Sequence, residues 1–136
     1  MTAAPLVAVA LLAAAPFTPQ AAITAAMTDS AAGWNAGNLD RFMAVYADNA
    51  IYVTTGGLVR GKAAIADRYR PSFTNGGNAR GRLSFRMLGD RRIDATHHIL
   101  FAQWILMGGV ETTSGMTTLV FERRGASWRI VADHSS

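Results

Sequence analysis

The second half of the chain constrains the fold most, because from about residue 82 onward it carries the periodicity of β-strands. Apolar and polar residues alternate between Leu83 and Met87, a pattern typical of a strand with one buried face. Residues 97–107 are apolar on both faces, and residues 116–122 and 128–133 complete the set of strands. We therefore expect the C-terminal half to fold into a twisted antiparallel sheet.

Two glycine-containing turns predict which strand residues share a face. Gly108-Gly109 suits a two-residue hairpin that pairs Met107 with Val110. Gly125-Ala126 suits a similar hairpin that pairs Arg124 with Ser127. This register gathers one set of side chains on the face expected to line a pocket: His98, Leu100, Trp104, Thr117, Leu119, Phe121, Trp128, Ile130 and His134. The opposite face would carry Ile99, Phe101, Gln103, Ile105, Met116, Val120, Val131 and Asp133.

A sheet that is apolar on both faces must have both faces covered. The three short helices expected in the N-terminal half suffice for one face only. We therefore expect a second copy of the chain to cover the other face, in a homodimer that buries Ile99, Phe101, Met116 and Val120.

The N-terminal half shows helical periodicity. Apolar side chains at three- and four-residue spacing predict a helix over residues 21–35, with one buried face made of Ile23, Met27, Ala31 and Trp34. A second helix, capped by Asn38, is expected to run to about residue 47, and a short strand is expected over residues 50–55. A third helix is expected from residue 61 or 62 to residue 70, where Pro71 ends it.

An apolar run of ten residues, 6–15, precedes the first expected helix. It is too short to span a bilayer and has the length of a signal-peptide core, although no basic residue precedes it. We therefore expect residues 1–20 to be a signal peptide or a disordered leader, and residues 21–136 to be the folded domain. An exported form, secreted or periplasmic, is expected to begin near residue 21 or 22; without export the protein would be cytoplasmic.

Composition excludes several kinds of chemistry. The 136 residues contain no cysteine, which excludes disulfides, thiolate nucleophiles and cysteine-bound metals. The formal net charge is +4, and several arginines cluster between residues 80 and 92. This cluster lacks the set of interleaved aromatic residues that base stacking uses. We therefore expect no nucleic-acid partner.

Several short segments resemble the nuclear transport factor 2-like (cystatin-like α+β) superfamily, and together they cover residues 21–136. Residues 34–40 (WNAGNLD) and 46–50 (YADNA) resemble the opening of that fold, and residues 61–65 (GKAAI) resemble the start of its third helix. Residues 118–121 and 128–136 resemble its closing hairpin. Within the superfamily the chain is most similar to the SnoaL-like group, which includes proteins of the SgcJ/EcaC type.

The resemblance implies an α+β fold in which three N-terminal helices pack on a curved antiparallel sheet and form a conical pocket. It also implies a homodimer and, as the ligand of the pocket, a small apolar molecule. A similar closing hairpin occurs in the association domain of calcium/calmodulin-dependent kinases, which is an oligomerisation module. The resemblance therefore implies a fold and a pocket but no particular reaction.

Local motifs for hydrolase, kinase or dehydrogenase chemistry are absent from the sequence. His97 and His98 are neighbours on an expected strand and would point to opposite faces, as would Asp133 and His134. We therefore expect neither a metal site nor a cofactor. Acid–base chemistry in an apolar pocket remains, and the residues available for it are Tyr46, Tyr52, Tyr69, His98, Asp133 and His134.

The ligand is expected to lie against side chains that share the pocket face or reach it from the helices: Trp104, His134, Tyr69, Tyr52, His98, Leu119 and Thr117. No catalytic residue can be assigned from local spacing. Three functions stay open: a cofactor-independent isomerase, cyclase or dehydratase, a non-catalytic binding protein, and a dimerisation module. The sequence narrowly favours binding, whereas a buried carboxyl or histidine facing an open cavity would indicate an enzyme.

Overall fold

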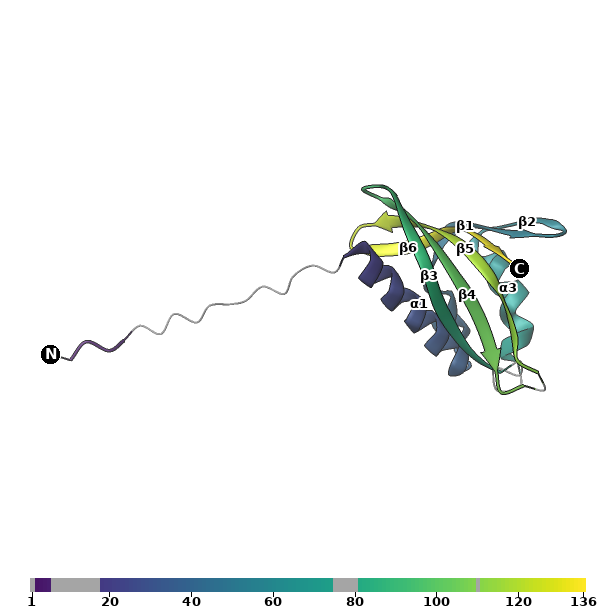
Figure 1. The fold of residues 1–136 in the computed structure, drawn as a ribbon, viewed down its shortest axis with the longest axis horizontal. Helices are drawn as coiled ribbons and strands as arrows, with labels where there is room; N and C mark the ends of the chain where they lie inside the picture. Colours follow the sequence, from purple (N-terminus) through teal and green to yellow (C-terminus); the bar gives the residue numbers. More distant parts are fainter. Residues whose placement is uncertain (1, 6–17, 75–80, 110) are drawn as a thin grey trace.

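The computed structural model describes residues 2–5, 18–74, 81–109 and 111–136, and Figure 1 shows the fold. The apolar run 6–15, Arg80 and Val110 lie outside the described residues. Two helices open the domain, a third follows the first two strands, and four long strands complete it. The α+β architecture expected from the sequence is confirmed. Within these ranges no helix is long and apolar enough to cross a membrane.

Helix α1 (Pro19–Asn35) begins two residues earlier than predicted, because Thr18 caps it. The Thr18 hydroxyl accepts a hydrogen bond from the Ala21 backbone N–H at 3.2 Å. Pro19 occupies the first turn, where a backbone N–H would have no partner within the helix, so the N–H that proline lacks is not missed. The predicted apolar face is confirmed, since Ile23, Met27, Ala31 and Trp34 are all buried. This face fixes α1 against the sheet.

Helix α2 (Leu39–Met43) is shorter than predicted and ends before strand β1 (Tyr46–Thr54) begins. Asn38 caps α2 as expected, by accepting a hydrogen bond from the Arg41 N–H at 3.0 Å. Residues 46 and 47 join the sheet because strand pairing outweighs their helical spacing. The two helices also approach closely, since a Cβ added to Gly33 would lie 2.4 Å from the Phe42 nitrogen.

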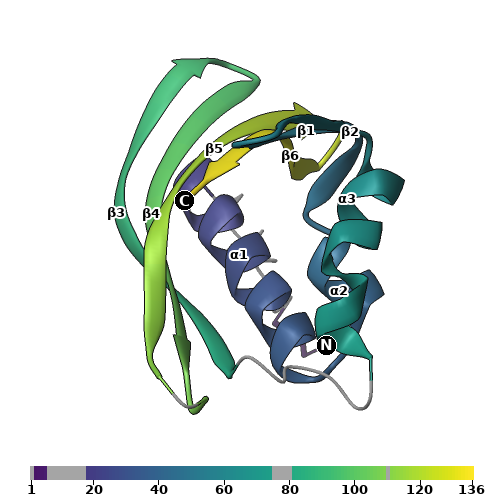
Figure 2. The same cartoon turned by 90° about the vertical axis from the view of Figure 1, so that its right-hand side faces the viewer.

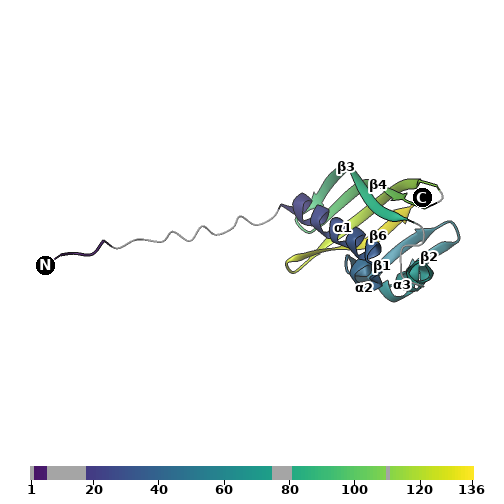
Figure 3. The ribbon, with the colours of Figure 1, turned by 90° about the horizontal axis from the view of Figure 1, so that it is seen from below.

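Strand β2 (Gly57–Arg60) forms a hairpin with β1 that the sequence analysis did not predict. Helix α3 (Lys62–Tyr69) follows within the predicted bounds and continues into a short 3-10 turn, η1 (Arg70–Phe73). Figures 2 and 3 show that the helices lie on the concave side of the sheet, with α1 running across it and α2 and α3 beside its β1–β2 end.

The remaining strands are β3 (Arg82–Asp94), β4 (His97–Met107), β5 (Thr113–Arg124) and β6 (Ser127–Ser135). They form one sheet with β1 and β2 in the order β2-β1-β6-β5-β4-β3. All neighbouring strands are antiparallel except β1 and β6, which run parallel. The antiparallel sheet expected after residue 82 is confirmed for β3 to β6, and the parallel pairing of β1 with β6 makes the complete sheet a mixed one.

One of the two predicted hairpin registers is confirmed. Arg124 pairs with Ser127 across Gly125, whose φ is 62°. The predicted two-residue turn at Gly108-Gly109 was wrong, because β5 starts only at Thr113, which pairs with Leu106. This shift of the register by two residues preserves the faces of β4 and β5, since side chains alternate with a period of two.

A β-bulge in β6 does change a face. Phe121 pairs with Ile130, but the next residue of β5, Val120, pairs with Ala132. Val131 is therefore an extra residue, and the alternation reverses beyond it. Asp133 turns to the inner face and is 3% exposed, whereas His134 lies exposed on the outer face. The predicted faces of Asp133 and His134 were both wrong for this reason.

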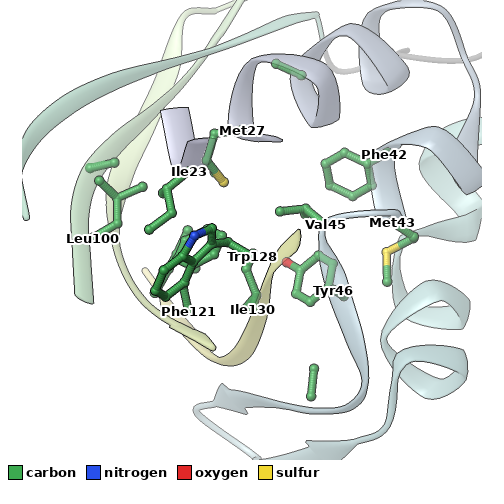
Figure 4. Close-up of a cluster of buried hydrophobic side chains, with 14 of the residues drawn as sticks. Ile23, Met27, Phe42, Met43, Val45, Tyr46, Leu100, Phe121, Trp128 and Ile130 are labelled. Atoms are coloured by element: carbon green, nitrogen blue, oxygen red, sulfur yellow. The ribbon is translucent and has the colours of Figure 1, made fainter. Parts of the chain in front are cut away.

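The buried core has two ends, which Figure 4 shows in close-up. Ile23 and Met27 of α1 face Leu100, Phe121 and Trp128 at one end. At the other end, Phe42, Met43 and Tyr46 gather beside α2, with Val45 and Ile130 between the two groups. The outer face of the sheet is not covered in the same way, since Phe101 is 40% and Met116 is 50% exposed.

Replacing Trp128 with alanine should destabilise the domain by about 3–5 kcal/mol, because the indole is buried and its cavity cannot collapse fully. The ring lies edge-on to His98, with centroids 5.3 Å apart. Urea unfolding monitored by circular dichroism measures the change. The exposed His134, replaced by glutamine, is the matched control and should change stability by no more than about 0.5 kcal/mol. Equal losses in the two variants would contradict this account of the core.

Candidate functional site

A pocket of about 220 Å³ lies between α1 and the concave face of the sheet. Seven of the residues that line it are aromatic: Trp34, Phe42, Tyr46, Tyr52, Tyr69, Phe85 and Trp104. The aliphatic part of the wall consists of Met27, Val45, Leu83, Leu106, Leu119 and Ile130. Its polar part is small and consists of Ser30, Thr117, Asp133, Ser135 and Ser136. Such an apolar cavity with a few convergent polar groups is typical of a small-molecule site.

Asp133 supplies the carboxyl group of the pocket. Its Oδ2 accepts a hydrogen bond from the Tyr46 hydroxyl at 2.6 Å. Tyr46 stands at the start of β1 and Asp133 near the end of β6, so the parallel pairing of these two strands brings the groups together. Both side chains are buried. The pair is therefore fixed by the sheet itself and not by a mobile loop.

Two further hydroxyl groups hold the other carboxyl oxygen. Asp133 Oδ1 accepts a hydrogen bond from Ser135 Oγ at 2.6 Å and a longer one from Thr117 Oγ1 at 3.5 Å. The Thr117 and Ser135 hydroxyls also lie 2.7 Å from each other. Because Thr117 can donate its one proton to Ser135 while Ser135 donates to Asp133, the carboxyl group lies in a cradle of three hydroxyl groups, two of which donate to it at 2.6 Å and favour its ionised form.

Burial and these hydrogen bonds have opposite effects on the pKa of Asp133. Burial raises the pKa of Asp133 above its ordinary value, while the bonds from Ser135, Tyr46 and Thr117 partly oppose the rise. Burial also raises the pKa of Tyr46 well above 10, and the nearby Tyr69 and Asp133 add to this effect. Tyr46 therefore stays protonated at neutral pH and remains a donor to Asp133.

Tyr69 and Tyr52 form the wall on the side of α3. Their rings are perpendicular, with centroids 6.2 Å apart, and Tyr69 also packs edge-on against Phe42 at 4.9 Å. Burial, Tyr52 and Asp133 raise the pKa of Tyr69 well above its ordinary value. The Tyr69 hydroxyl is therefore a neutral hydrogen-bonding group at physiological pH.

Five of the seven residues predicted to contact a ligand line this pocket: Trp104, Tyr69, Tyr52, Leu119 and Thr117. Trp104 is only half-buried, and its indole N–H donates to the Ser136 carbonyl at 3.1 Å. The five residues come from α3, β1, β4 and β5, so the fold unites side chains that are far apart in the sequence.

The two predicted histidines lie elsewhere. His134 is exposed on the outer face because of the bulge at Val131, so the expectation that it lines the pocket was wrong. His98 does face inward, but it is 1% exposed, packs against Trp128 and is not part of the pocket wall. Its Nδ1 lies 3.6 Å from Asp90 Oδ2, beyond hydrogen-bonding distance.

Asp133 and Tyr46 were both acid–base candidates from the sequence, but their contact was not predicted. The bulge has no periodicity signal, because the extra residue Val131 and its neighbours Ile130 and Ala132 are all apolar. Ser135 was missed altogether. The run of hydroxyl and carboxyl residues at 133–136 was the one available signal, and strand alternation would place Asp133 and Ser135 on the same face.

The chemistry that this site supports is proton transfer in a largely apolar pocket. Asp133 can take or return a proton, and the tyrosine hydroxyls can donate hydrogen bonds to a polar group of a ligand. Among the described residues, no group of three or more histidine, aspartate or glutamate side chains could hold a metal ion.

Comparison with known proteins agrees with this fold. The family model described as a SnoaL-like domain matches residues 23–136. A solved NTF-2-like protein of unknown function from Shewanella oneidensis MR-1 superposes with a TM-score of 0.79 at 23% identity, over 88% of this chain and 99% of that one. No curated protein sequence shows significant similarity.

Two other solved structures carry informative descriptions. A putative calcium/calmodulin-dependent protein kinase type II association domain from Thiobacillus denitrificans ATCC 25259 is 31% identical, with a TM-score of 0.67 over 88% of this chain and 94% of that one. A ketosteroid isomerase-like protein from Erwinia carotovora atroseptica SCRI1043 is 16% identical, with a TM-score of 0.66 over 88% and 97% of the two chains. At that identity the second likeness is one of fold.

The raised pKa of Asp133 predicts a specific pH dependence of stability. Between the unfolded pKa, about 4, and the higher folded pKa, the native protein binds more protons than the unfolded chain. The unfolding free energy of the wild type relative to Asp133→Asn should therefore fall as pH rises from about 4. Urea unfolding at several pH values between 3 and 8 measures this difference.

Asp94 is the matched control with the opposite sign. Hydrogen bonds from the Thr96 backbone and from His97 lower the pKa of Asp94 to about 2. The stability of the wild type relative to Asp94→Asn should therefore rise as pH increases from about 2 to about 4. If Asp133 and Asp94 gave pH profiles of the same sign, the assignment of Asp133 as a group destabilised by burial would be wrong.

Proposed function

Since the chain belongs to the SnoaL-like domain family, we propose that it is a cofactor-independent acid–base enzyme of the isomerase, cyclase or dehydratase kind. Its substrate would be a small, mostly apolar molecule that fits the aromatic pocket. The observation that carries the proposal is Asp133, a buried carboxyl group that faces an open cavity. This was the feature expected to separate an enzyme from a simple binding protein.

Asp133 has the properties of a general base. Burial moves its pKa toward neutrality, where a base combines the ionised form with useful proton affinity. In an isomerisation, the carboxylate would take a proton from a carbon next to a carbonyl group. The electron pair of the C–H bond would form a C=C bond while the carbonyl π pair moves onto oxygen, which gives an enolate. In a substrate whose enolate is conjugated with a second C=C bond, the same proton would return at the far carbon of that bond, and the double bond would shift.

The tyrosines have a separate role in this proposal. Tyr46 is committed to Asp133 and orients the carboxyl group. The Tyr69 hydroxyl, protonated at neutral pH because burial raises its pKa, would donate a hydrogen bond to the developing oxyanion. The ketosteroid isomerase-like description of the Erwinia structure supports this class of reaction through its shared fold.

Non-catalytic binding is the second candidate, and one observation favours it. The Asp133 carboxyl already accepts a hydrogen bond of 2.6 Å on each oxygen, from Tyr46 and from Ser135, as a structural carboxylate would. A binding protein would use the aromatic wall to hold its ligand and Asp133 only to shape the pocket. The two candidates differ in whether a bound carbon acid exchanges its protons.

Exchange of the α-protons of small cyclic ketones in D₂O, followed by NMR, tests the catalytic proposal. The wild type should accelerate exchange, and Asp133→Asn should lose about 10²- to 10⁴-fold of that acceleration, because the amide cannot accept the proton. Asparagine retains the shape of the side chain and an acceptor for Ser135. His134→Gln, on the opposite face, should exchange at the wild-type rate. Ketone binding without accelerated exchange would identify a binding protein instead.

We also propose that the outer face of the sheet forms a homodimer. Phe101 and Met116 are exposed there, and Ile99 and Val120 flank them as partners across β4 and β5. The description of the Thiobacillus relative as an association domain supports assembly in this family.

Phe101→Glu should convert the dimer into monomer or aggregate, because a charge would be buried in an apolar interface. Light scattering coupled to size-exclusion chromatography measures the mass. Thr24→Glu, on the exposed side of α1, is the matched control and should remain dimeric. A monomeric wild type that is unchanged by Phe101→Glu would refute the interface.

A further inference from the structure

The pocket has an unbalanced charge. Of the side chains that line it within the described ranges, Asp133 is the one that carries a formal charge, and no lysine, arginine or histidine joins it. Nor does Asp133 take part in an ion pair in this part of the chain. A carboxylate that is 3% exposed is costly unless a positive charge accompanies it.

The cations near the pocket wall point elsewhere. Arg68 lies over the outer side of the wall, with its guanidinium carbon 5.6 Å from the centroid of the Tyr52 ring, and it does not line the cavity. His134 follows Asp133 in the sequence but lies on the opposite face of the sheet. The hydroxyl cradle of Tyr46, Ser135 and Thr117 supplies hydrogen bonds to the carboxylate but no countercharge.

The rest of the wall suits a cation. Seven aromatic rings line the cavity, and the negative faces of such rings attract ammonium groups, more strongly where water is excluded. A carboxylate among aromatic rings provides both an ion-pair partner and the surrounding π systems. An anionic ligand would meet the same carboxylate with no cation to compensate it.

We infer that the ligand of this pocket carries a protonated amine, which supplies the countercharge of Asp133, and that carboxylates and phosphates are excluded. The inference rests on the proposed function only in placing the ligand beside Asp133. It deepens that function by naming the class of substrate: a small, largely apolar amine, whose ammonium group would pair with one carboxyl oxygen of Asp133 and leave the other to act as the base.

Three probes of similar size and different charge test the inference at pH 7: benzylamine, which is protonated, benzyl alcohol and benzoate. Quenching of tryptophan fluorescence reports binding, since Trp34 and Trp104 line the cavity, and calorimetry confirms it. Benzylamine should bind at least tenfold more tightly than benzyl alcohol, equivalent to about 1.4 kcal/mol, and benzoate should not bind. Equal affinity for the amine and the alcohol, or binding of benzoate, would overturn the inference.

Two variants test whether Asp133 causes the preference for benzylamine. Asp133→Asn should bind benzylamine and benzyl alcohol equally, whereas Asp94→Asn, at an exposed carboxyl outside the pocket, should keep the tenfold preference. A preference that survives in Asp133→Asn would refute the role of this carboxylate. If Asp133→Asn does not fold, the ranking of the three probes on the wild type still decides.

The outcome is separable from that of the proposed enzyme activity. Ketone exchange that depends on Asp133, without a preference for the amine probe, would retain the enzyme and refute the charge selectivity. A clear amine preference without proton exchange would support an amine-binding pocket and refute proton transfer from ketones.

Discussion

The extra residue in β6 determines which groups reach the cavity. Before Val131 the inner face of β6 is apolar, with Trp128 and Ile130 in the core, and after it the inner face is polar, with Asp133 and Ser135. Without the bulge, the same strand would direct His134 inward and leave the carboxyl group on the outer surface. The apolar core and the polar site therefore lie along one strand, separated by a single irregularity.

The cost of burying the carboxyl group is reduced by hydrogen bonds from the surrounding strands. Tyr46, Ser135 and Thr117 belong to three adjacent strands, β1, β6 and β5, and their hydroxyls reach both carboxyl oxygens. Each of these donors favours the ionised group, while the apolar cavity disfavours it. The balance keeps a titratable group in a place where most proteins would put an aliphatic side chain, and such groups concentrate at functional sites.

Local patterns were sufficient for most of the fold. The face of α1, the cap of α2, the bounds of α3 and the register at Gly125 all follow from interactions between residues close in the sequence. The elements that depend on distant partners could not be predicted in this way. Strand β1 starts where helical spacing continues, and its parallel partner β6 lies at the other end of the chain.

The candidate site, too, could be predicted only where it depends on local patterns. Trp104, Leu119 and Thr117 could be placed in the pocket because the alternation in β4 and β5 is regular. His134 could not be placed correctly, since one unpaired residue reverses every side chain that follows it. The Tyr46–Asp133 contact requires both the bulge, which turns Asp133 inward, and the parallel pairing of β1 with β6. Neither feature can be predicted from the local sequence pattern.

The parallel pairing of β1 and β6 also has a consequence for how the domain folds. The hydrogen bond that completes the site joins residues 87 positions apart, and β6, the strand between β1 and β5 in the sheet, comes last in the chain. Contacts of such long sequence separation pay a large loop-closure entropy and slow the folding of a small domain. On a ribosome, α1, α2 and β1 would emerge long before their central partner strand is made. The apolar surfaces of the first half of the domain therefore stay partly uncovered until β6 is synthesised. Only then can the pocket form around the carboxyl group of Asp133.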